Sequence, residues 1–282
     1  MGKPVQNTPL VDLLKILLTV GIVLRHSTPA DIPEGGGWVS LLFKGVVLVT
    51  EVCVPLFFVL SGFLFFLSTP EDPAASWFAK KLGRRVHSLL IPYLIANLFA
   101  LACYAAASHW YPQMLSGFLG ENWKDPLFAF WKGPVNLSLW FIRELMLVSL
   151  LSPVVFLLVR YTRWWGVLVL GVLTYFGLTP APWLWFSLGA MTAFDPRTRA
   201  LVCKVQLNIP PAWRGWCYFV YLYHYIPILA VKKMAYAQAG SLWMQPMAGL
   251  AAALTVLLLL SGAYLILRRW LPRVLGLLIG GK

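Results

Sequence analysis

Long apolar segments recur along this chain and constrain its fold more than any other feature. The sequence is 60% hydrophobic and only 12% charged, whereas soluble domains are about 45–50% apolar and roughly 25% charged. Apolar stretches of about 20 residues are long enough to cross a bilayer as helices. Helices also satisfy every backbone polar group internally, as a bilayer requires. The sequence therefore predicts an all-α fold, a polytopic membrane helical bundle.

We expect about eight transmembrane helices, which together form a single domain over residues 1–282. Charged segments and segments rich in proline or glycine, such as TPADIPEGGGW and TPAP, separate the apolar stretches. The polar, proline-bearing segment 195–213 is expected to be a loop, as is the stretch that leads to residue 134. The expected spans are residues 10–27, 47–68, 86–108, 137–159, 164–178, 183–194, 214–231 and 246–267.

The net charge of +13 is explained by membrane orientation. Lys and Arg accumulate in the cytoplasmic loops of membrane proteins, and a cytoplasmic N-terminus here places about fifteen of them inside and about five outside. Both termini are therefore predicted to be cytoplasmic. A basic chain also suits nucleic acid, but the loop distribution accounts for the charge. We expect the lipid bilayer as a partner, and no nucleic acid.

The first apolar segment, VDLLKILLTVGIVLRHS, contains three ionisable residues, Asp12, Lys15 and His26. At about 100° per residue, the step from Lys15 to His26 returns to within ~20° of the same helix face, about 16 Å further along. Asp12 neighbours Lys15 on that face. An ionisable group in a bilayer costs at least ~2.5–3.5 kcal/mol unless it faces protein or water. The spacing predicts a polar channel along this helix; the alternative is a stabilising Asp–Lys pair with an interfacial histidine.

His26 is the leading candidate for catalysis. An imidazole takes a proton from a hydroxyl and returns it to a leaving group at neutral pH. A partner must hold its tautomer, and Glu51 and Glu144 both suit that role by topology. Arg143 and Glu144 are alternatively a structural pair between helices.

Two further groups of residues are candidates. The cluster KKLGRRVH contains Lys80, Lys81, Arg84 and Arg85. Positive-inside anchoring explains this cluster; the functional alternative is a clamp for the phosphates of a nucleotide-like donor. His224 lies within FVYLYHYIP beside Tyr223, and it is a candidate because ionisable residues at membrane depth usually serve a function.

Motifs of several enzyme classes are missing from the sequence. It contains no GxSxG, P-loop, HExxH or GxGxxG pattern, so hydrolysis by serine, nucleotide hydrolysis and zinc protease chemistry lose support. Its four cysteines have no ligand-like spacing. We expect them to be inert, with no metal site and no permanently bound cofactor.

Five segments, in order, resemble the acyltransferase family 3 of integral membrane proteins, which O-acylate bacterial surface glycans. Asp12, Lys15 and His26 match the family's opening helix, and His224 matches its late segment. Ser88 departs from the family because it replaces the second arginine of a pair that begins at Arg85, unless Lys81 and Arg84 serve as that pair instead. The family also usually has more spans, and the shortfall lies around 195–213. The other matches are VPLFFVLSGFLFF (Pro55, Phe57, Phe58, Ser61, Gly62, Phe63), RRVHSLLIPYLIANL (Pro92, Tyr93, Asn97) and LWFIRELMLVSLLSP.

The resemblance implies transfer of an acyl group, most simply acetyl, from cytoplasmic acyl-CoA (acetyl-CoA) to a hydroxyl of a cell-surface or lipid-linked glycan. It also implies a bacterial inner (plasma) membrane protein. His26 is then the general base, oriented by Glu51 or Glu144; a variant of the mechanism forms an acyl-histidine. The donor is expected to contact Asp12, Lys15, Lys80, Lys81, Arg84 and Arg85, and the acceptor to contact Arg143, His224, Tyr223 and Ser61. The alternatives are a transporter or flippase of a glycan precursor, with a polar pathway along the first helix, and a non-catalytic scaffold.

Overall fold

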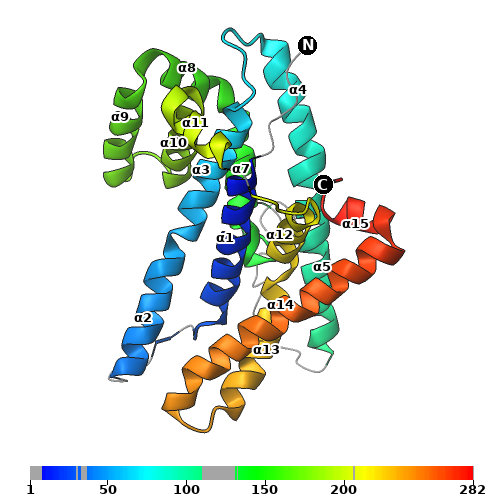
Figure 1. The fold of residues 1–282 in the computed structure, drawn as a ribbon. Coiled ribbons are helices and arrows are strands. Elements are labelled where there is room, and N and C mark those ends of the chain that lie inside the picture. Colours follow the sequence, from blue (N-terminus) through cyan, green and yellow to red (C-terminus); the bar gives the residue numbers. More distant parts are fainter. Residues whose placement is uncertain are drawn as a thin grey trace. The chain divides into compact units, whose positions relative to one another are not determined.

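The computed structural model describes residues 8–29, 31–32, 37–109, 131, 133–205 and 207–281. Every regular element in this part of the chain is a helix, which confirms the all-α prediction (Figure 1). Most of the predicted loop before residue 134 lies outside the described residues. The principal helices are α1 (Pro9–Ser27), α2 (Trp38–Glu51), α3 (Cys53–Phe66), α4 (Ala75–Arg85), α5 (Ile91–Ser108), α7 (Trp140–Leu150), α8 (Ser152–Thr162), α9 (Trp164–Tyr175), α10 (Ala181–Phe194), α11 (Pro196–Lys204), α12 (Ala212–Tyr223), α13 (Tyr225–Gln238), α14 (Gln245–Trp270) and α15 (Pro272–Leu278).

The chain divides into two compact units, each assembled from separate stretches of sequence. The single-domain expectation remains a prediction. Because α1 runs across the boundary between Leu18 and Thr19, it contributes Asp12 and Lys15 to the first unit and His26 to the second. The first unit comprises Met1–Leu18, Val52–Arg85 and Glu144–Arg214, and the second comprises Thr19–Glu51, Val86–Arg143 and Gly215–Lys282.

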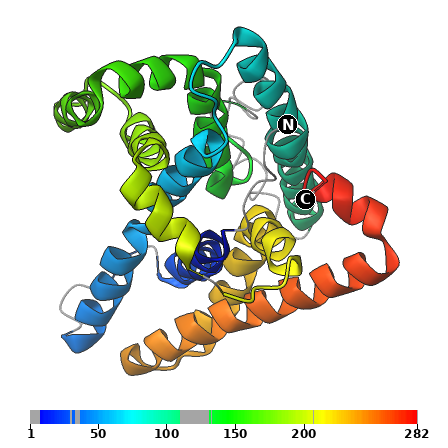
Figure 2. The ribbon, with the colours of Figure 1, turned by 45° about the horizontal axis from the view of Figure 1, so that its top comes forward.

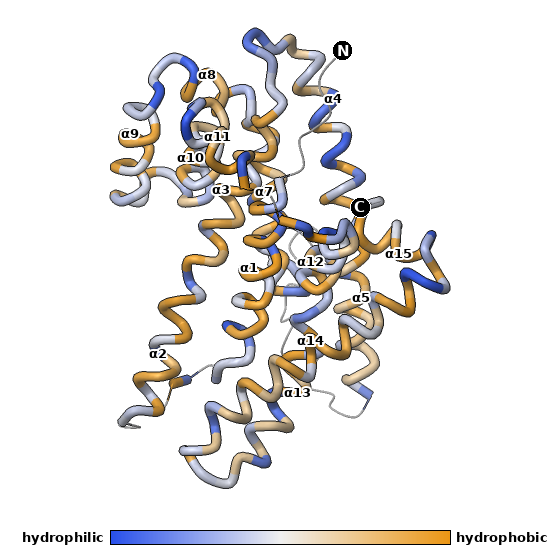
Figure 3. Tube along the Cα trace, viewed as in Figure 1, coloured by the Kyte–Doolittle hydropathy of each residue, from blue (hydrophilic) through white to orange (hydrophobic). Residues whose placement is uncertain are grey.

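Three helical stretches of the described chain are long and apolar enough to cross a membrane: Trp38–Phe66, Ala75–Ser108 and Leu242–Trp270. A further pair, Leu137–Leu150 and Ser152–Thr162, meets the same criterion but is bent by 64°. Figure 3 shows the apolar character of α2 and α3 and the hydrophilic stretches of α4. These helices are those of a membrane protein. The count of eight spans and the cytoplasmic position of both termini remain predictions.

The segment 195–213, expected to be a loop, contains the helix α11, so that expectation was wrong. Asp195 caps this helix by accepting a hydrogen bond from the backbone nitrogen of Thr198 at 3.0 Å. The bonds from Thr198 lower the pKa of the Asp195 carboxyl. Pro196 lies at the start of α11, where a missing N–H costs nothing. The same prolines that suggest a loop therefore mark a helix start here.

Prolines explain where the longer helices break. Pro153 cannot donate the backbone hydrogen bond that would continue α7 into α8, and this accounts for the 64° bend. The predicted span 214–231 is likewise divided at His224 into α12 and α13, three residues before Pro227. His224 consequently lies at a bend between two helices and not in the middle of one.

Pro92 produces a different irregularity in the third predicted span. The helix begins at Ala75, earlier than expected, and passes through a π-helical turn at Val86–Leu90 before α5. Pro92 has no N–H for the carbonyl oxygen of Ser88. That oxygen instead accepts a hydrogen bond from the hydroxyl of Tyr218 at 3.0 Å. A side chain of α12 thus replaces the backbone partner that the proline removes.

Helices α3 and α10 form the core of the first unit through a close backbone crossing. A Cβ atom on Gly62 would overlap the carbonyl oxygen of Phe186, and one on Gly189 would overlap that of Val59. Small residues allow such close approach between membrane helices. Aromatic side chains fill the surrounding space, with Phe66 and Phe186 ring centroids 5.9 Å apart.

The second unit is held by polar contacts as well as by packing. Helix α13 lies beside α14 (Figure 2). Buried amide and hydroxyl groups also connect α5, the turn Leu137–Leu139 and α12. Two of these hydrogen bonds, at Tyr221 and Leu222, lie next to the α12–α13 bend.

Candidate functional site

The second unit brings the two predicted membrane histidines together. The ring centroids of His26 on α1 and His224 at the α12–α13 bend are 5.2 Å apart, with a 45° angle between the rings. The ring of Tyr225 packs against His26 in a T-shaped arrangement, with centroids 5.3 Å apart and an angle of 88° between the rings. His26 is half-buried, whereas His224 is completely buried. Among the described residues of this unit, the two imidazoles form a group that can accept and donate protons near neutral pH.

The hydrogen bonds of His224 identify its tautomer. Its Nδ1 lies 2.8 Å from the carbonyl oxygen of Tyr221 and 3.2 Å from that of Val220. Carbonyl oxygens only accept hydrogen bonds, so Nδ1 carries the proton. In the neutral ring, Nε2 then keeps a lone pair. Within the described chain this buried Nε2 has no hydrogen-bond partner.

Side chains of α13 hold the end of α1 that carries His26. The ammonium of Lys232 donates to the carbonyl oxygens of His26 and Thr28 at 3.1 and 3.2 Å. The hydroxyl of Tyr236 donates to the carbonyl oxygen of Ser27 at 3.0 Å. A helix C-terminus leaves such carbonyls without intrahelical partners and attracts cations. These contacts fix the backbone of His26, and neither Lys232 nor Tyr236 was predicted from the sequence.

A buried amide network holds the end of α12 next to His224. The side-chain nitrogen of Asn136 donates to the carbonyl oxygen of Leu222 at 3.0 Å, and its backbone nitrogen donates to Oδ1 of Asn97 at 3.1 Å. The side-chain oxygen of Asn136 accepts from the Ser138 hydroxyl at 2.7 Å. The hydroxyl of Tyr221 donates to the carbonyl oxygen of Ser138 at 2.6 Å. This network orients the backbone that accepts the Nδ1–H of His224.

In the first unit, Asp12 is the centre of an ion-pair group. Its carboxylate is 2.7 Å from Nε of Arg214 and 3.7 Å from the ammonium of Lys15. Asp12 is buried and both cations are partly exposed. The predicted pairing with Lys15 is present. Arg214 is an additional partner that the sequence analysis did not predict. The sequence indicates only that Asp12 and Arg214 both lie on the predicted cytoplasmic side.

In the first unit, part of the basic cluster Lys80–Arg85 contacts the end of α3. The ammonium of Lys81 donates to the carbonyl oxygen of Phe65 and to the hydroxyl of Ser68. It also lies 4.5 Å from the ring centroid of Trp77, and the Arg85 guanidinium lies 5.3 Å from that of Phe65. The ammonium of Lys81, which belongs to α4, therefore lies at the C-terminus of α3. Lys80 and Arg84 are exposed.

The remaining predicted residues are distributed over several elements. Glu51 is exposed at the end of α2, and Glu144 and Ser61 are half-buried on α7 and α3. Arg143 donates to the carbonyl oxygen of Trp131 at 2.9 Å. The hydroxyl of Tyr223 is 3.4 Å from the carbonyl oxygen of Leu278. In the described chain, His26 forms no ion pair with a carboxylate, and its ring contacts are those with His224 and Tyr225.

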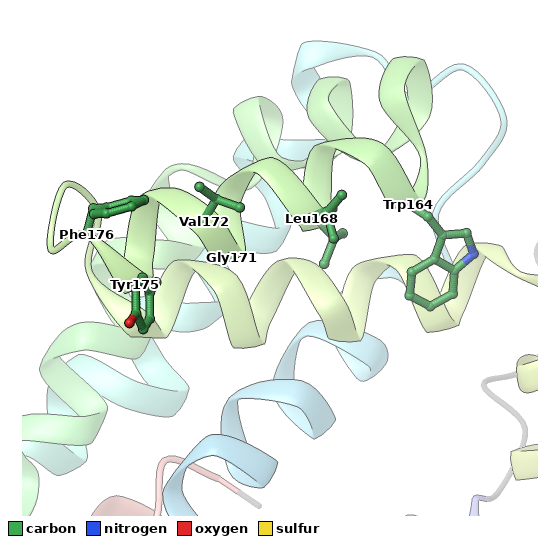
Figure 4. A pocket seen from close by; sticks show the side chains of 7 residues that line it. Trp164, Leu168, Gly171, Val172, Tyr175 and Phe176 are labelled. Carbon is green, nitrogen blue, oxygen red and sulfur yellow. The ribbon is translucent and has the colours of Figure 1, made fainter.

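An apolar groove of about 730 Å³ runs along α9 (Figure 4). It is lined by Trp164, Val167, Leu168, Gly171, Val172, Tyr175 and Phe176. None of these residues belongs to the predicted site, and none carries a charge. The groove has the lining of a surface that contacts lipid or other apolar groups, and it contains no histidine for acyl transfer.

The helical fold and the paired histidines define a membrane protein with an imidazole site, and the comparisons identify its family. Residues 9–196 match the family described as an acyltransferase domain, acyltransferase 3. The chain therefore belongs to the acyltransferase 3 family, as the sequence resemblance predicted.

A curated relative indicates the biological setting of similar chains. The chain is 33% identical over 184 residues to the succinoglycan biosynthesis protein ExoH of Rhizobium meliloti (strain 1021). The alignment covers 61% of this chain and 48% of the relative, so the chain spans about half of the relative's length. No solved structure matches the chain.

Proposed function

We propose that the protein is a membrane O-acyltransferase that moves an acyl group, acetyl in the simplest case, from acyl-CoA to a hydroxyl of a cell-surface or lipid-linked polysaccharide. The family match supports the reaction class, and the relative's role in succinoglycan biosynthesis supports a polysaccharide acceptor. The observation that carries the proposal is the half-buried His26 beside the buried His224, at a backbone held by Lys232.

His26 is the general base of the proposed reaction. Its imidazole accepts the proton of the acceptor hydroxyl while the hydroxyl oxygen forms a bond to the thioester carbonyl carbon. The carbon–sulfur bond then breaks, and the departing sulfur takes the proton from the imidazolium. The products are the ester and the CoA thiol, and His26 returns to its neutral form.

The donor carries phosphate groups, which we propose to be bound by basic side chains of the first unit. Lys80 and Arg84 are exposed and suit this role. Lys81 already binds the end of α3, so its contribution is to the position of this cluster. Lys15 and Asp12 are the donor-binding candidates on α1. The protein is proposed to lie in a bacterial inner membrane, with acyl-CoA as a co-substrate.

The proposal is tested with purified protein in proteoliposomes, acetyl-CoA and de-esterified succinoglycan as the acceptor. Wild-type protein should release CoA thiol and form ester in equal amounts. His26→Ala should lower both rates by at least about 100-fold. His109→Ala, which alters a histidine in a turn after α5, is the matched control and should retain the wild-type rate.

Two results would contradict the proposal. One is ester formation by His26→Ala at the wild-type rate, with unchanged thermal unfolding. The other is movement of a glycan precursor across the vesicle membrane with no consumption of acetyl-CoA, which is the behaviour of a transporter.

A further inference from the structure

His224 presents a buried lone pair that the structure leaves unused. It is fully buried, and its Nε2 has no hydrogen-bond partner in the described chain. Leaving a buried polar atom without a hydrogen bond destabilises the folded state. A protonated ring would be worse, because it would add an uncompensated charge at a fully buried position. The arrangement is therefore suited to a neutral ring that accepts one hydrogen bond from a group that completes the site.

The neighbouring group is His26. The two ring centroids are 5.2 Å apart, so an N–H···N hydrogen bond can form when the rings are turned to place a nitrogen of each on the line between the centroids. Catalytic hydrogen bonds are often long in a free enzyme and shorten when the substrates bind. His26 has an N–H to donate in its neutral form, and His224 has only an acceptor to offer.

We propose that His224 is the positioning residue for His26, and this inference rests on the proposed acyl transfer. The Nδ1–H of His224 donates to the carbonyl oxygen of Tyr221, and Nε2 of His224 accepts the N–H of His26. The second nitrogen of His26 then keeps its lone pair directed to the acceptor hydroxyl. His224 thus replaces the carboxylate that Glu51 or Glu144 was expected to supply.

A neutral positioning group suits this environment. A carboxylate taken into a low-dielectric interior without a matched partner carries a large desolvation penalty. A neutral imidazole that donates a hydrogen bond from one nitrogen to a carbonyl oxygen carries no net charge, and its other nitrogen still offers a directed acceptor. The packing of Tyr225 against His26 and the contacts of Lys232 with the α1 backbone keep the two rings adjacent.

Three substitutions at His224 separate the two hydrogen bonds. His224→Gln keeps an acceptor oxygen near the position of Nε2. His224→Asn keeps a donor near the position of Nδ1 but cannot reach His26. His224→Leu removes both. If the proposal holds, Asn and Leu lower kcat by about 100-fold at unchanged KM for acetyl-CoA, whereas Gln stays within about tenfold of wild type.

The tautomer of His26 provides a readout that does not depend on activity. The chain has four histidines, so ¹⁵N-imidazole labelling in a His87→Gln/His109→Gln background leaves only the signals of His26 and His224. We expect a single neutral tautomer for His26 in this background and a mixture of both tautomers after His224→Leu. Thermal unfolding of each variant reports any general loss of structure.

The outcomes are distinguishable. Equal kcat loss in the Gln and Leu variants, wild-type kcat in the Leu variant, or an unchanged His26 tautomer in that variant would each overturn the role of His224. Absence of acetyl transfer by the wild-type protein would instead overturn the proposed function, while the tautomer measurement still tests the pair.

Discussion

In the first unit, α3 and α10 approach through glycines and aromatic rings, whereas in the second unit α5, α12 and the Leu137–Leu139 turn meet through buried hydrogen bonds. In a bilayer the hydrophobic effect does not favour helix association, so close packing and interhelical hydrogen bonds must provide it. The imidazole pair lies in the unit that contains the buried hydrogen-bond network, where a fixed backbone can orient a titratable ring.

The glycine crossing should be the most sensitive point of the first unit. Gly189→Val adds side-chain atoms where even a Cβ would overlap the carbonyl oxygen of Val59. The helices must separate, and we expect a loss of stability of about 3 kcal/mol or more. The unfolding midpoint in detergent micelles measures this loss.

Gly262→Ala is the matched control for that substitution, because a Cβ at Gly262 meets no atom within 4 Å. It should be neutral or stabilising, since alanine favours a helix interior over glycine by about 1 kcal/mol. Similar unfolding midpoints for both variants would show that close approach does not hold the first unit together.

In the second unit, we expect the largest loss of stability from substitutions in the buried amide network. Asn136→Ala removes the partners that its side chain gives to the Leu222 carbonyl oxygen and to the Ser138 hydroxyl, at about 1–3 kcal/mol for each buried group. Acetyl transfer should fall with stability, because the network holds the backbone next to His224.

The control for the network lies in the first unit. Ser187 is fully buried, and its hydroxyl has no hydrogen-bond partner in the described chain. Ser187→Ala should therefore leave the unfolding midpoint unchanged or raise it. A larger loss from Ser187→Ala than from Asn136→Ala would invert the proposed difference between the units.

The smallest expected loss of stability concerns the Ser88 carbonyl group, which Pro92 leaves without a backbone hydrogen-bond donor. Tyr218→Phe removes the hydroxyl that donates to the Ser88 oxygen, and we expect a loss of about 1 kcal/mol. In a Pro92→Ala background the helix can supply its own N–H to that oxygen, so Tyr218→Phe should cost less. A double-mutant cycle of unfolding free energies measures the coupling; no coupling would mean that Tyr218 does not compensate for the proline.

Much of the fold followed from simple sequence rules. The apolar segments predicted helices because a helix is the local structure that satisfies its own backbone in lipid. The limits of those helices were less predictable. Pro153 and Pro227 mark breaks inside predicted spans, and Pro196 marks the start of a helix in a predicted loop. A proline has opposite effects inside a helix and at its first turn, and the position of that turn depends on contacts beyond the local sequence.

The sequence by itself determined that His26 and His224 are candidates, because ionisable residues are costly at membrane depth and so are rarely there without a reason. Only the tertiary structure decided that the two rings are neighbours, that Nδ1 of His224 is hydrogen-bonded to backbone carbonyl oxygens, and that Lys232 holds the end of α1. The contacts of His26 with His224 and with Lys232 join residues about two hundred positions apart, on helices that meet only when the chain folds. Local patterns report the preference of each segment for lipid or water, whereas the pairing of side chains depends on how the helices pack.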